Sequence, residues 1–288
     1  MAAGLRAQAR RLWRLAWVLL LVPVSVAEAV FLAIVDALAP RLRRRIQPPM
    51  MRAWCGWLAL LWGIRISVQG EPVAAPAMLA CNHRSWLDIV VLGATIHGSF
   101  ISKAELDRWP VVGYLARHGG STLYISRGEM RSFRQLGGNL VARLNESTRI
   151  IFFPEGGISG DRLLLRFRPR LFAAAIAARC AVQPVAIEYC GGDGADQAPM
   201  GATEPFALHA WRLLRYRRIE VRTTFLDPLD PHGRDEKALA AQAQAAVAGV
   251  LSPASPRGGK TFADTLGAAE RGLRGEGSDI NGKKGAGV

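Results

Sequence analysis

Apolar and polar positions are distributed along this chain in three different ways. In the range 15–35 the chain is almost continuously apolar, with 18 hydrophobic side chains in 21 residues. In the range 66–251, apolar runs of strand length alternate with longer stretches of helical periodicity. The range 252–288 is rich in Gly, Ser and charged residues and has few large apolar side chains. The pattern predicts an N-terminal membrane-anchoring helical segment at 1–65, a folded domain at 66–251 and a disordered tail at 252–288.

The alternation in the middle region predicts an α/β domain. Strands are expected at 66–68, 78–81, 100–102, 122–126, 149–153, 182–189 and 219–225, and helices at 86–94, 110–117, 131–144, 169–179, 205–216 and 235–251. A repeated order of strand, helix and strand is typical of a mostly parallel central sheet flanked by helices, with right-handed crossovers. The active sites of such sheets lie beyond the C-terminal ends of the strands.

The first apolar run favours insertion into a membrane. Its Leu, Val, Ile and Phe side chains each contribute about −0.3 to −0.6 kcal/mol to insertion, against about +3 kcal/mol for Glu28. The alternative is a secretory signal peptide that is cleaved after Ala27-Glu28-Ala29. Arginines lie on both sides of the run, so the positive-inside rule gives no orientation, and a spanning helix and a re-entrant helix both remain open. A second stretch, Trp54 to Ile64, is too short to span. Its three tryptophans favour an interfacial helix over an ordinary core helix.

The positive charge is concentrated in the N-terminal region. The whole chain carries a formal net charge of +14, and residues 1–66 contain ten arginines against Glu28 and Asp36. Arginines beside apolar runs suit an anionic membrane surface better than a nucleic acid, and no zinc-finger spacing is present. The four cysteines are widely spaced, which indicates reduced thiols of a cytoplasmic protein. No metal ion and no cofactor are expected.

The candidate chemistry begins at the end of the strand expected at 78–81. His83 follows that strand and Asp88 lies in the first turns of the next helix. A single turn between them lets the carboxylate bind one imidazole nitrogen, while the other nitrogen faces outward as a general base. The alternative is a helix capping box formed by Ser85 and Asp88, with His83 as an ordinary surface histidine. Arg127 and Glu155 also follow strands, so the same sheet edge is expected to gather three charged groups.

Four sequence blocks carry a resemblance to a known family. The first is N-H-x-x-x-x-D at Asn82, His83 and Asp88, and the second ends a strand on Arg127. The third is F-F-P-E-G-G-I-S at 152–159, and the fourth is a strand at 182–187 that contains a proline. In order and spacing the blocks resemble the glycerolipid acyltransferases, the 1-acylglycerol-3-phosphate acyltransferases and their relatives.

The resemblance implies roles for particular residues. It makes His83 the catalytic base and Asp88 its partner. The substrate-binding residues that it implies, including a basic residue near 103 and the Phe-Arg pair at 167–168, are Asn82, Lys103, Arg127, Glu155, Gly156 and Arg168. For Glu155, an ion pair that orients an arginine and a direct contact with the acceptor both remain open.

The third block departs from the usual family form, F-P-E-G-T-R-S. Gly157 replaces the threonine, and Ile158 replaces an arginine that in the family helps to hold the phosphate of the acceptor. Relatives with F-P-E-G-T-T-S act on other lyso-lipids, including lyso-ornithine lipid. The candidates to supply the missing charge are Arg127, Arg162, Arg166 and Arg168.

The resemblance implies a membrane-associated acyltransferase at the cytoplasmic face of the inner membrane. The donor is acyl-CoA or acyl-acyl-carrier protein. The first expected acceptor is 1-acyl-sn-glycerol-3-phosphate, which would give phosphatidic acid, and the alternative acceptor is lyso-ornithine lipid. A non-catalytic module that binds anionic membrane lipid also explains the charge, but it does not explain the residues at the strand ends. His97, His118, His209 and His232 match no motif and are expected to be surface or core residues.

Overall fold

Helices and strands alternate through the computed structural model, which describes residues 2–103, 122–125, 130–160, 164–201, 203–251 and 260–261. The helices are α1 (Ala2–Leu38), α2 (Pro40–Leu61), α3 (Leu87–Thr95), α6 (Met130–Asn145), η1 (Pro169–Leu171), α7 (Phe172–Ala178), η2 (Ala195–Gln197), α8 (Phe206–Leu213) and α9 (Glu236–Leu251). The strands are β1 (Ile64–Gln69), β2 (Ala77–Cys81), β3 (Ser99–Lys103), β4 (Thr122–Ile125), β5 (Arg149–Phe152), β6 (Ala181–Gly191), β7 (Ile219–Phe225) and β8 (Lys260–Thr261).

The described strands form one sheet in the order β4-β3-β5-β2-β6-β7-β1-β8. The five strands from β4 to β6 are parallel to one another, and β1 is parallel to β7. Because β7 runs antiparallel to β6, both β7 and β1 begin at the edge where β2, β5 and β6 end. The predicted α/β fold with a mostly parallel sheet is therefore confirmed. The N-terminal ends of β1 and β7 lie at the sheet edge where the active site is expected.

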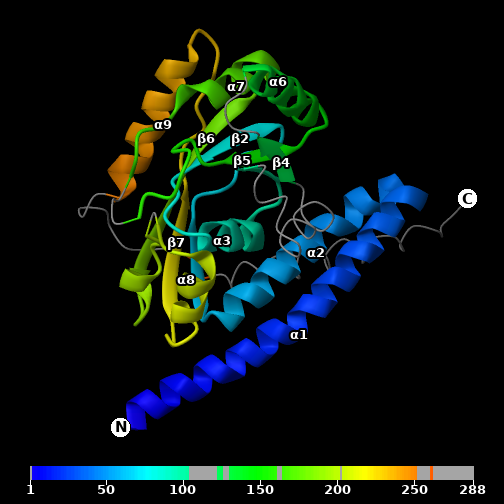
Figure 1. Cartoon of the computed structure of the whole chain (residues 1–288). Coiled ribbons are helices and arrows are strands. Elements are labelled where there is room, and N and C mark those ends of the chain that lie inside the picture. The colour runs from blue at the N-terminus through cyan, green and yellow to red at the C-terminus, as the bar shows by residue number, and fades with distance from the viewer. Residues whose placement is uncertain are drawn as a thin grey trace, which may run out of the picture.

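Helices cover both faces of the sheet, which explains the continuous apolar character of the central strands. Every residue of β2 is buried. Its side chains alternate between two cores, with Leu79 in the core that includes α2, α3 and α8 and Met78 in the core that includes α6, α7 and α9. Figure 1 shows these two helical layers on opposite sides of the strands. Burial on both faces is typical of parallel strands in α/β proteins.

The helices α1 and α2 form an antiparallel hairpin that projects from the α/β domain (Figure 1). The two helices are joined by a 2.7 Å hydrogen bond from Trp54 Nε1 to Ser25 Oγ and by a 2.7 Å ion pair between Arg43 and Asp36. Arg14 attaches α1 to the domain, because its guanidinium donates to the carbonyl oxygens of Leu214 and Tyr216.

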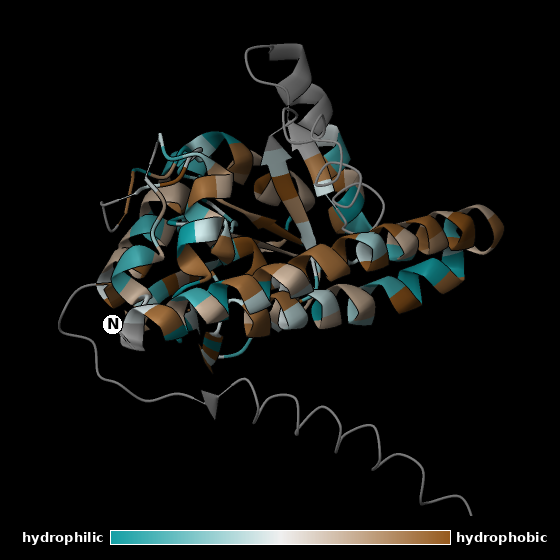
Figure 2. Cartoon of the chain, turned by 60° about the horizontal axis from the view of Figure 1, so that its bottom comes forward, coloured by the Kyte–Doolittle hydropathy of each residue, from teal (hydrophilic) through white to brown (hydrophobic). Residues whose placement is uncertain are grey.

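One side of the hairpin is apolar and exposed to solvent in the structure. Most of the exposed large hydrophobic side chains among the described residues belong to α1, including Leu19, Leu20 and Phe31. Figure 2 shows the hydrophobic colouring along the part of the hairpin that projects beyond the domain. Residues 4–38 form a helix that is long and apolar enough to cross a membrane. An exposed apolar surface of this length indicates a membrane-associated protein.

The arginine-rich range 41–49 forms the first half of α2, with Pro48 and Pro49 inside the helix. Pro40 occupies a first-turn position that suits proline. Packing of α2 against α1 and α3 compensates for the backbone hydrogen bonds that the inner prolines remove. The first strand, expected at 66–68, runs from Ile64 to Gln69. The helix expected at 110–117 lies outside the described residues, and so does the tail except for β8, which pairs with β1.

Candidate active site

The first residue after β2 fixes the start of the active-site loop. The side-chain amide of Asn82 donates to the carbonyl oxygen of Ile187 at 2.9 Å, and its oxygen accepts from the Ile187 N–H at 2.7 Å. Asn82 is fully buried by these contacts. A contact between Asn82 and a substrate stays a prediction. Asn82 acts as a positioning residue that holds the loop against β6.

His83 and Asp88 form the pair that their spacing predicts. His83 Nδ1 lies 2.8 Å from Asp88 Oδ2, and the carboxylate is fully buried while the imidazole is 14 % exposed. Nε2 of His83 makes no hydrogen bond within the described part of the chain. The carboxylate therefore holds the tautomer that carries the proton on Nδ1, and it leaves Nε2 free to accept a proton from a substrate.

The same carboxylate also organises the start of α3. Asp88 Oδ2 accepts hydrogen bonds from the backbone N–H of Arg84 at 2.7 Å and of Ser85 at 2.9 Å, and Ser85 Oγ accepts from the N–H of Leu87. These contacts are those of a capping motif. One carboxylate thus makes both the contacts of the capping alternative and the contact with the imidazole, and the first turn of a helix also stabilises it electrostatically.

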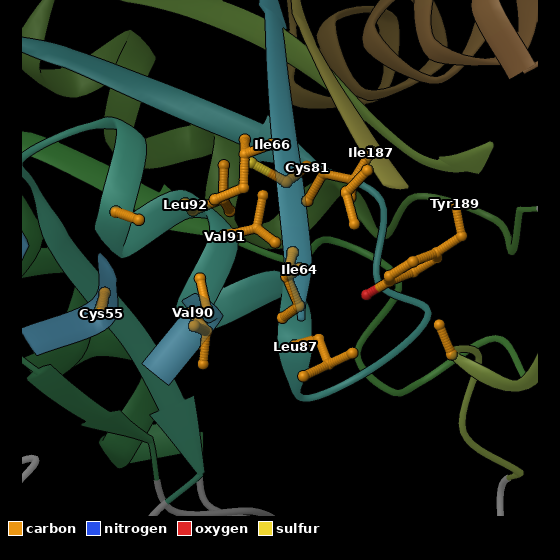
Figure 3. Close-up of a cluster of buried hydrophobic side chains, with 14 of the residues drawn as sticks. Cys55, Ile64, Ile66, Cys81, Leu87, Val90, Val91, Leu92, Ile187 and Tyr189 are labelled. Carbon is orange, nitrogen blue, oxygen red and sulfur yellow. The ribbon is translucent and has the colours of Figure 1, made fainter. Parts of the chain in front are cut away.

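Tyr189 is a member of the site that the motif analysis missed. Its hydroxyl donates a 2.6 Å hydrogen bond to Asp88 Oδ1, the oxygen that His83 does not use. Burial and the charge of Asp88 raise the pKa of the Tyr189 phenol well above its usual value, so the phenol stays protonated and remains a donor. Figure 3 shows Tyr189 at the margin of an apolar cluster, with its hydroxyl directed toward the segment that carries Leu87. The contact could be found only from the fold, which places β6, with Tyr189, next to β2.

The third sequence block supports the catalytic loop from β5. Phe153 stacks on the His83 imidazole with a centroid distance of 3.9 Å and an interplanar angle of 17°. Glu155 Oε1 accepts from the His83 backbone N–H at 2.8 Å, and Oε2 accepts from the Leu165 N–H at 3.0 Å. Ser159 closes the arrangement by donating its N–H to the carbonyl oxygen of His83 at 2.8 Å.

Glu155 makes contacts that neither expectation named. Its two carboxylate oxygens bind backbone groups, and it has no ion pair with an arginine within the described residues. Burial raises the pKa of Glu155 to about 7, although the two backbone N–H groups act in the opposite direction. Glu155 joins the His83 loop to the segment at 164–168. This role could not be predicted from the sequence, because it depends on the tertiary structure.

Gly156 and Arg168 lie against each other beside this loop. Gly156 has a φ of +74°, which favours glycine. A Cβ built at Gly156 would lie 3.0 to 3.1 Å from three atoms of the Arg168 guanidinium. Arg168 itself is exposed, and its backbone N–H donates to the carbonyl oxygen of Pro154. The structure thus brings one of the expected substrate-binding arginines next to the catalytic loop. Arg127 and Arg162 lie outside the described residues, and of Lys103 only the backbone in β3 is described.

Comparison with known proteins identifies the family of this chain. A model of the acyltransferase family matches residues 65–188. The lyso-ornithine lipid O-acyltransferase of Pseudomonas aeruginosa is 36 % identical over 242 residues, which cover 84 % of this chain and 93 % of that protein. The chain belongs to the acyltransferase family. The 1-acyl-sn-glycerol-3-phosphate acyltransferase of Neisseria meningitidis is 33 % identical over 150 residues, or 52 % of this chain and 58 % of that protein. The crystal structure of the 1-acyl-sn-glycerophosphate acyltransferase of Thermotoga maritima has the same fold, with a TM-score of 0.66 and 19 % identity over 90 % of this chain and all of that one.

A second group of aromatic and polar contacts holds Trp86, which belongs to the loop between His83 and Asp88 of this acyltransferase. Trp86, between His83 and Asp88 in sequence, donates from Nε1 to His209 Nδ1 at 3.0 Å. Its ring also packs edge-on against Trp62 of α2 and Phe206 of α8. Burial lowers the pKa of His209, so its ring stays neutral and its Nδ1 stays an acceptor. His209 is thus a core residue as expected, but one that holds Trp86.

The described residues of the acyltransferase contain no group of three or more His, Cys, Asp or Glu side chains that is arranged to hold a metal ion. Cys55, Cys81 and Cys180 are buried free thiols, and Cys190 is an exposed one. The 2.8 Å contact between His83 and the buried Asp88 gives the loop an oriented imidazole base with a carboxylate partner.

Proposed function

We propose that this acyltransferase moves a fatty acyl group from a thioester donor to the hydroxyl group of lyso-ornithine lipid at the cytoplasmic face of the membrane. The observation that carries the reaction is the 2.8 Å contact of His83 Nδ1 with the buried Asp88, which leaves Nε2 free. The free thiols support the cytoplasmic face.

In the proposed mechanism His83 Nε2 removes the proton of the lyso-lipid hydroxyl as its oxygen attacks the carbonyl carbon of the thioester. Asp88 stabilises the imidazolium that forms. The tetrahedral intermediate collapses with cleavage of the carbon–sulfur bond, and the departing thiolate takes the proton from His83. The products are an ester-linked acyl chain and a free thiol, on coenzyme A or on an acyl carrier protein.

Two observations favour lyso-ornithine lipid over lysophosphatidic acid, which the sequence placed first. Ile158 stands where the phosphate-holding arginine of the family is expected. The Pseudomonas lyso-ornithine lipid enzyme is also similar over 84 % of this chain, against 52 % for the Neisseria enzyme that acts on 1-acyl-sn-glycerol 3-phosphate.

Lysophosphatidic acid is kept as a second candidate because of Arg168. Its guanidinium lies against Gly156 beside the catalytic loop and is exposed. A guanidinium binds a phosphate or a carboxylate through paired hydrogen bonds, so this arginine suits the phosphate of one acceptor and the carboxylate of the other.

The test is an acceptor panel with purified full-length protein. Lyso-ornithine lipid and lysophosphatidic acid are each offered with labelled acyl-CoA and with labelled acyl-acyl-carrier protein, and kcat/KM is measured. We expect the larger kcat/KM with lyso-ornithine lipid. Ile158→Arg should raise kcat/KM for lysophosphatidic acid, and Arg168→Gln should lower kcat/KM for both acceptors about tenfold. Arg234→Gln, on an exposed loop before α9, is the charge-matched control. Absence of transfer to either acceptor with either donor would refute the proposal.

A further inference from the structure

A cavity of about 560 Å³ lies between the hairpin and the sheet, apart from the catalytic loop. Its wall includes Arg14 of α1, Arg65 at the start of β1, and Arg217 and Arg218 just before β7. Asp193 contributes the acidic side chain. Four arginines against one aspartate leave a formal charge of +3 on the wall of the cavity. This charge favours an anionic ligand.

Two of the charged side chains in the wall are occupied by the protein itself. Arg14 donates to the carbonyl oxygens of Leu214, Tyr216 and Arg217 at 3.2, 2.6 and 3.4 Å. Asp193 accepts hydrogen bonds from the backbone N–H groups of Arg217 and Arg218 at 3.0 and 2.8 Å. Arg14 and Asp193 therefore build the wall and hold the turn before β7, and their polar atoms are not left for a ligand.

The remaining arginines of the wall are available to bind an anionic ligand. Arg65 and Arg217 are exposed, and neither guanidinium has a hydrogen-bonding or ion-pair partner within the described ranges of the chain. Arg218 forms a 3.0 Å ion pair with Glu220, but both side chains are largely exposed, at 59 % and 38 %. Such an exposed pair is weak and exchanges readily with another anion. The cavity thus presents two free guanidinium groups and a third that a ligand can recruit.

The cavity lies near the active site because β6 connects the two. Tyr189 of β6 binds Asp88, and Gly192, three residues further, lines the cavity. Three residues of extended chain span about 10 Å. The starts of β1 and β7 lie at the same sheet edge as the end of β2, which precedes His83.

The neighbouring helices indicate the depth of the cavity relative to a membrane. Two residues of the cavity wall, Arg14 and Leu60, each have an exposed tryptophan nearby on the same helix. Trp13, next to Arg14, is 61 % exposed, and Trp57, one helical turn before Leu60, is 63 % exposed. Exposed tryptophans beside an apolar helix favour the headgroup level of a bilayer. The cavity therefore opens where lipid phosphates are concentrated.

We propose that this cavity binds the phosphate group of an anionic phospholipid headgroup, through Arg65, Arg217 and Arg218. Phosphate is the chemistry that paired guanidinium groups recognise best. The phosphates at the nucleotide end of coenzyme A are a second source of the same chemistry. Binding of membrane lipid here is separate from the proposed acyl transfer, and it would orient the domain so that the catalytic loop faces the bilayer surface.

The test measures binding without turnover, so its result does not depend on the proposed reaction. Full-length protein in uncharged detergent micelles is titrated by calorimetry with dihexanoyl-phosphatidylglycerol, with dihexanoyl-phosphatidylcholine and with adenosine 3′,5′-bisphosphate. The variant is Arg65→Gln/Arg217→Gln. The control is Arg143→Gln/Arg234→Gln, which removes the same charge from α6 and from the loop before α9.

We expect the wild type and the control to bind dihexanoyl-phosphatidylglycerol in preference to dihexanoyl-phosphatidylcholine, and the cavity variant to bind the anionic lipid about tenfold more weakly. The same loss for adenosine 3′,5′-bisphosphate alone would retain the phosphate site and assign it to the acyl donor. Equal binding of both phosphate probes by the cavity variant and the control would overturn the proposal.

Discussion

The Tyr189 hydroxyl and the Asp88 carboxylate are joined by a 2.6 Å hydrogen bond. Asp88 uses its other oxygen for His83 at 2.8 Å, so the tyrosine and the histidine hold the carboxylate from two sides. A buried carboxylate needs all of these donors, because an ion without partners is costly in an apolar core. Tyr189 is therefore a positioning residue that acts on His83 through Asp88.

Tyr189→Phe should lower kcat with little change in the KM of either substrate. The change removes a hydrogen bond to a charged group, which contributes about 1.5–3 kcal/mol, so kcat is expected to fall about tenfold or more. The measurement is steady-state kinetics, with Tyr216→Phe, in the turn between α8 and β7, as the control. A loss that appears in KM alone would contradict the positioning role.

His83→Ala and Asp88→Asn should each reduce turnover by about 10²-fold or more, because the first removes the base and the second removes the charge that stabilises the imidazolium. Acyl transfer is measured alongside circular dichroism, since Asp88 also caps α3. Activity close to that of the wild type in His83→Ala would exclude the mechanism.

Glu155 should give a particular pH dependence of stability. Burial raises the pKa of its carboxyl from 4.5 to about 7. Between these pH values the folded protein retains a proton that the unfolded chain has released, so this group makes the free energy of unfolding fall as pH rises. Relative to Glu155→Gln, which does not titrate, the wild type should lose up to about 3 kcal/mol across this window. Denaturant unfolding of both proteins at several pH values measures the difference. A difference that is constant or grows with pH would contradict the prediction.

His209 should matter for catalysis only through Trp86. His209→Leu removes the acceptor for the Trp86 indole, whereas Asn at this position can still accept that hydrogen bond. We expect His209→Leu to lower kcat severalfold and to change the tryptophan fluorescence, and His209→Asn to restore most of both. If the two variants are equally impaired, the side chain supports only the fold.

The apolar surface of α1 should decide membrane association. Leu19, Leu20 and Phe31 are exposed at 62, 59 and 49 %, whereas Leu32 is fully buried. Replacing the three exposed residues by Asn removes about 1.5–3 kcal/mol of apolar burial for each, and it leaves the Arg14 attachment intact. We expect this variant to move from the membrane pellet to the soluble fraction. An unchanged distribution, with a folded protein, would assign membrane binding to another surface.

The sequence by itself determined the α/β pattern, the strand ends that carry His83 and Glu155, and the apolar N-terminal helix. These are local properties, since periodicity and a five-residue spacing depend only on neighbours in the chain. The contact between His83 and Asp88 followed from one turn of backbone, and this is why the motif was sufficient to predict that the two side chains meet.

Only the tertiary structure decided which residues meet across the sheet. Tyr189 lies 101 residues from Asp88, and His209 lies 123 residues from Trp86. Such contacts depend on strand order and on the direction of β6 and β7, which no local pattern specifies. The same reason explains why the backbone contacts of Asn82 and Glu155 were not expected from the sequence. Their side chains are the right chemistry for a ligand, but the fold turns them toward backbone groups that would otherwise be buried without partners.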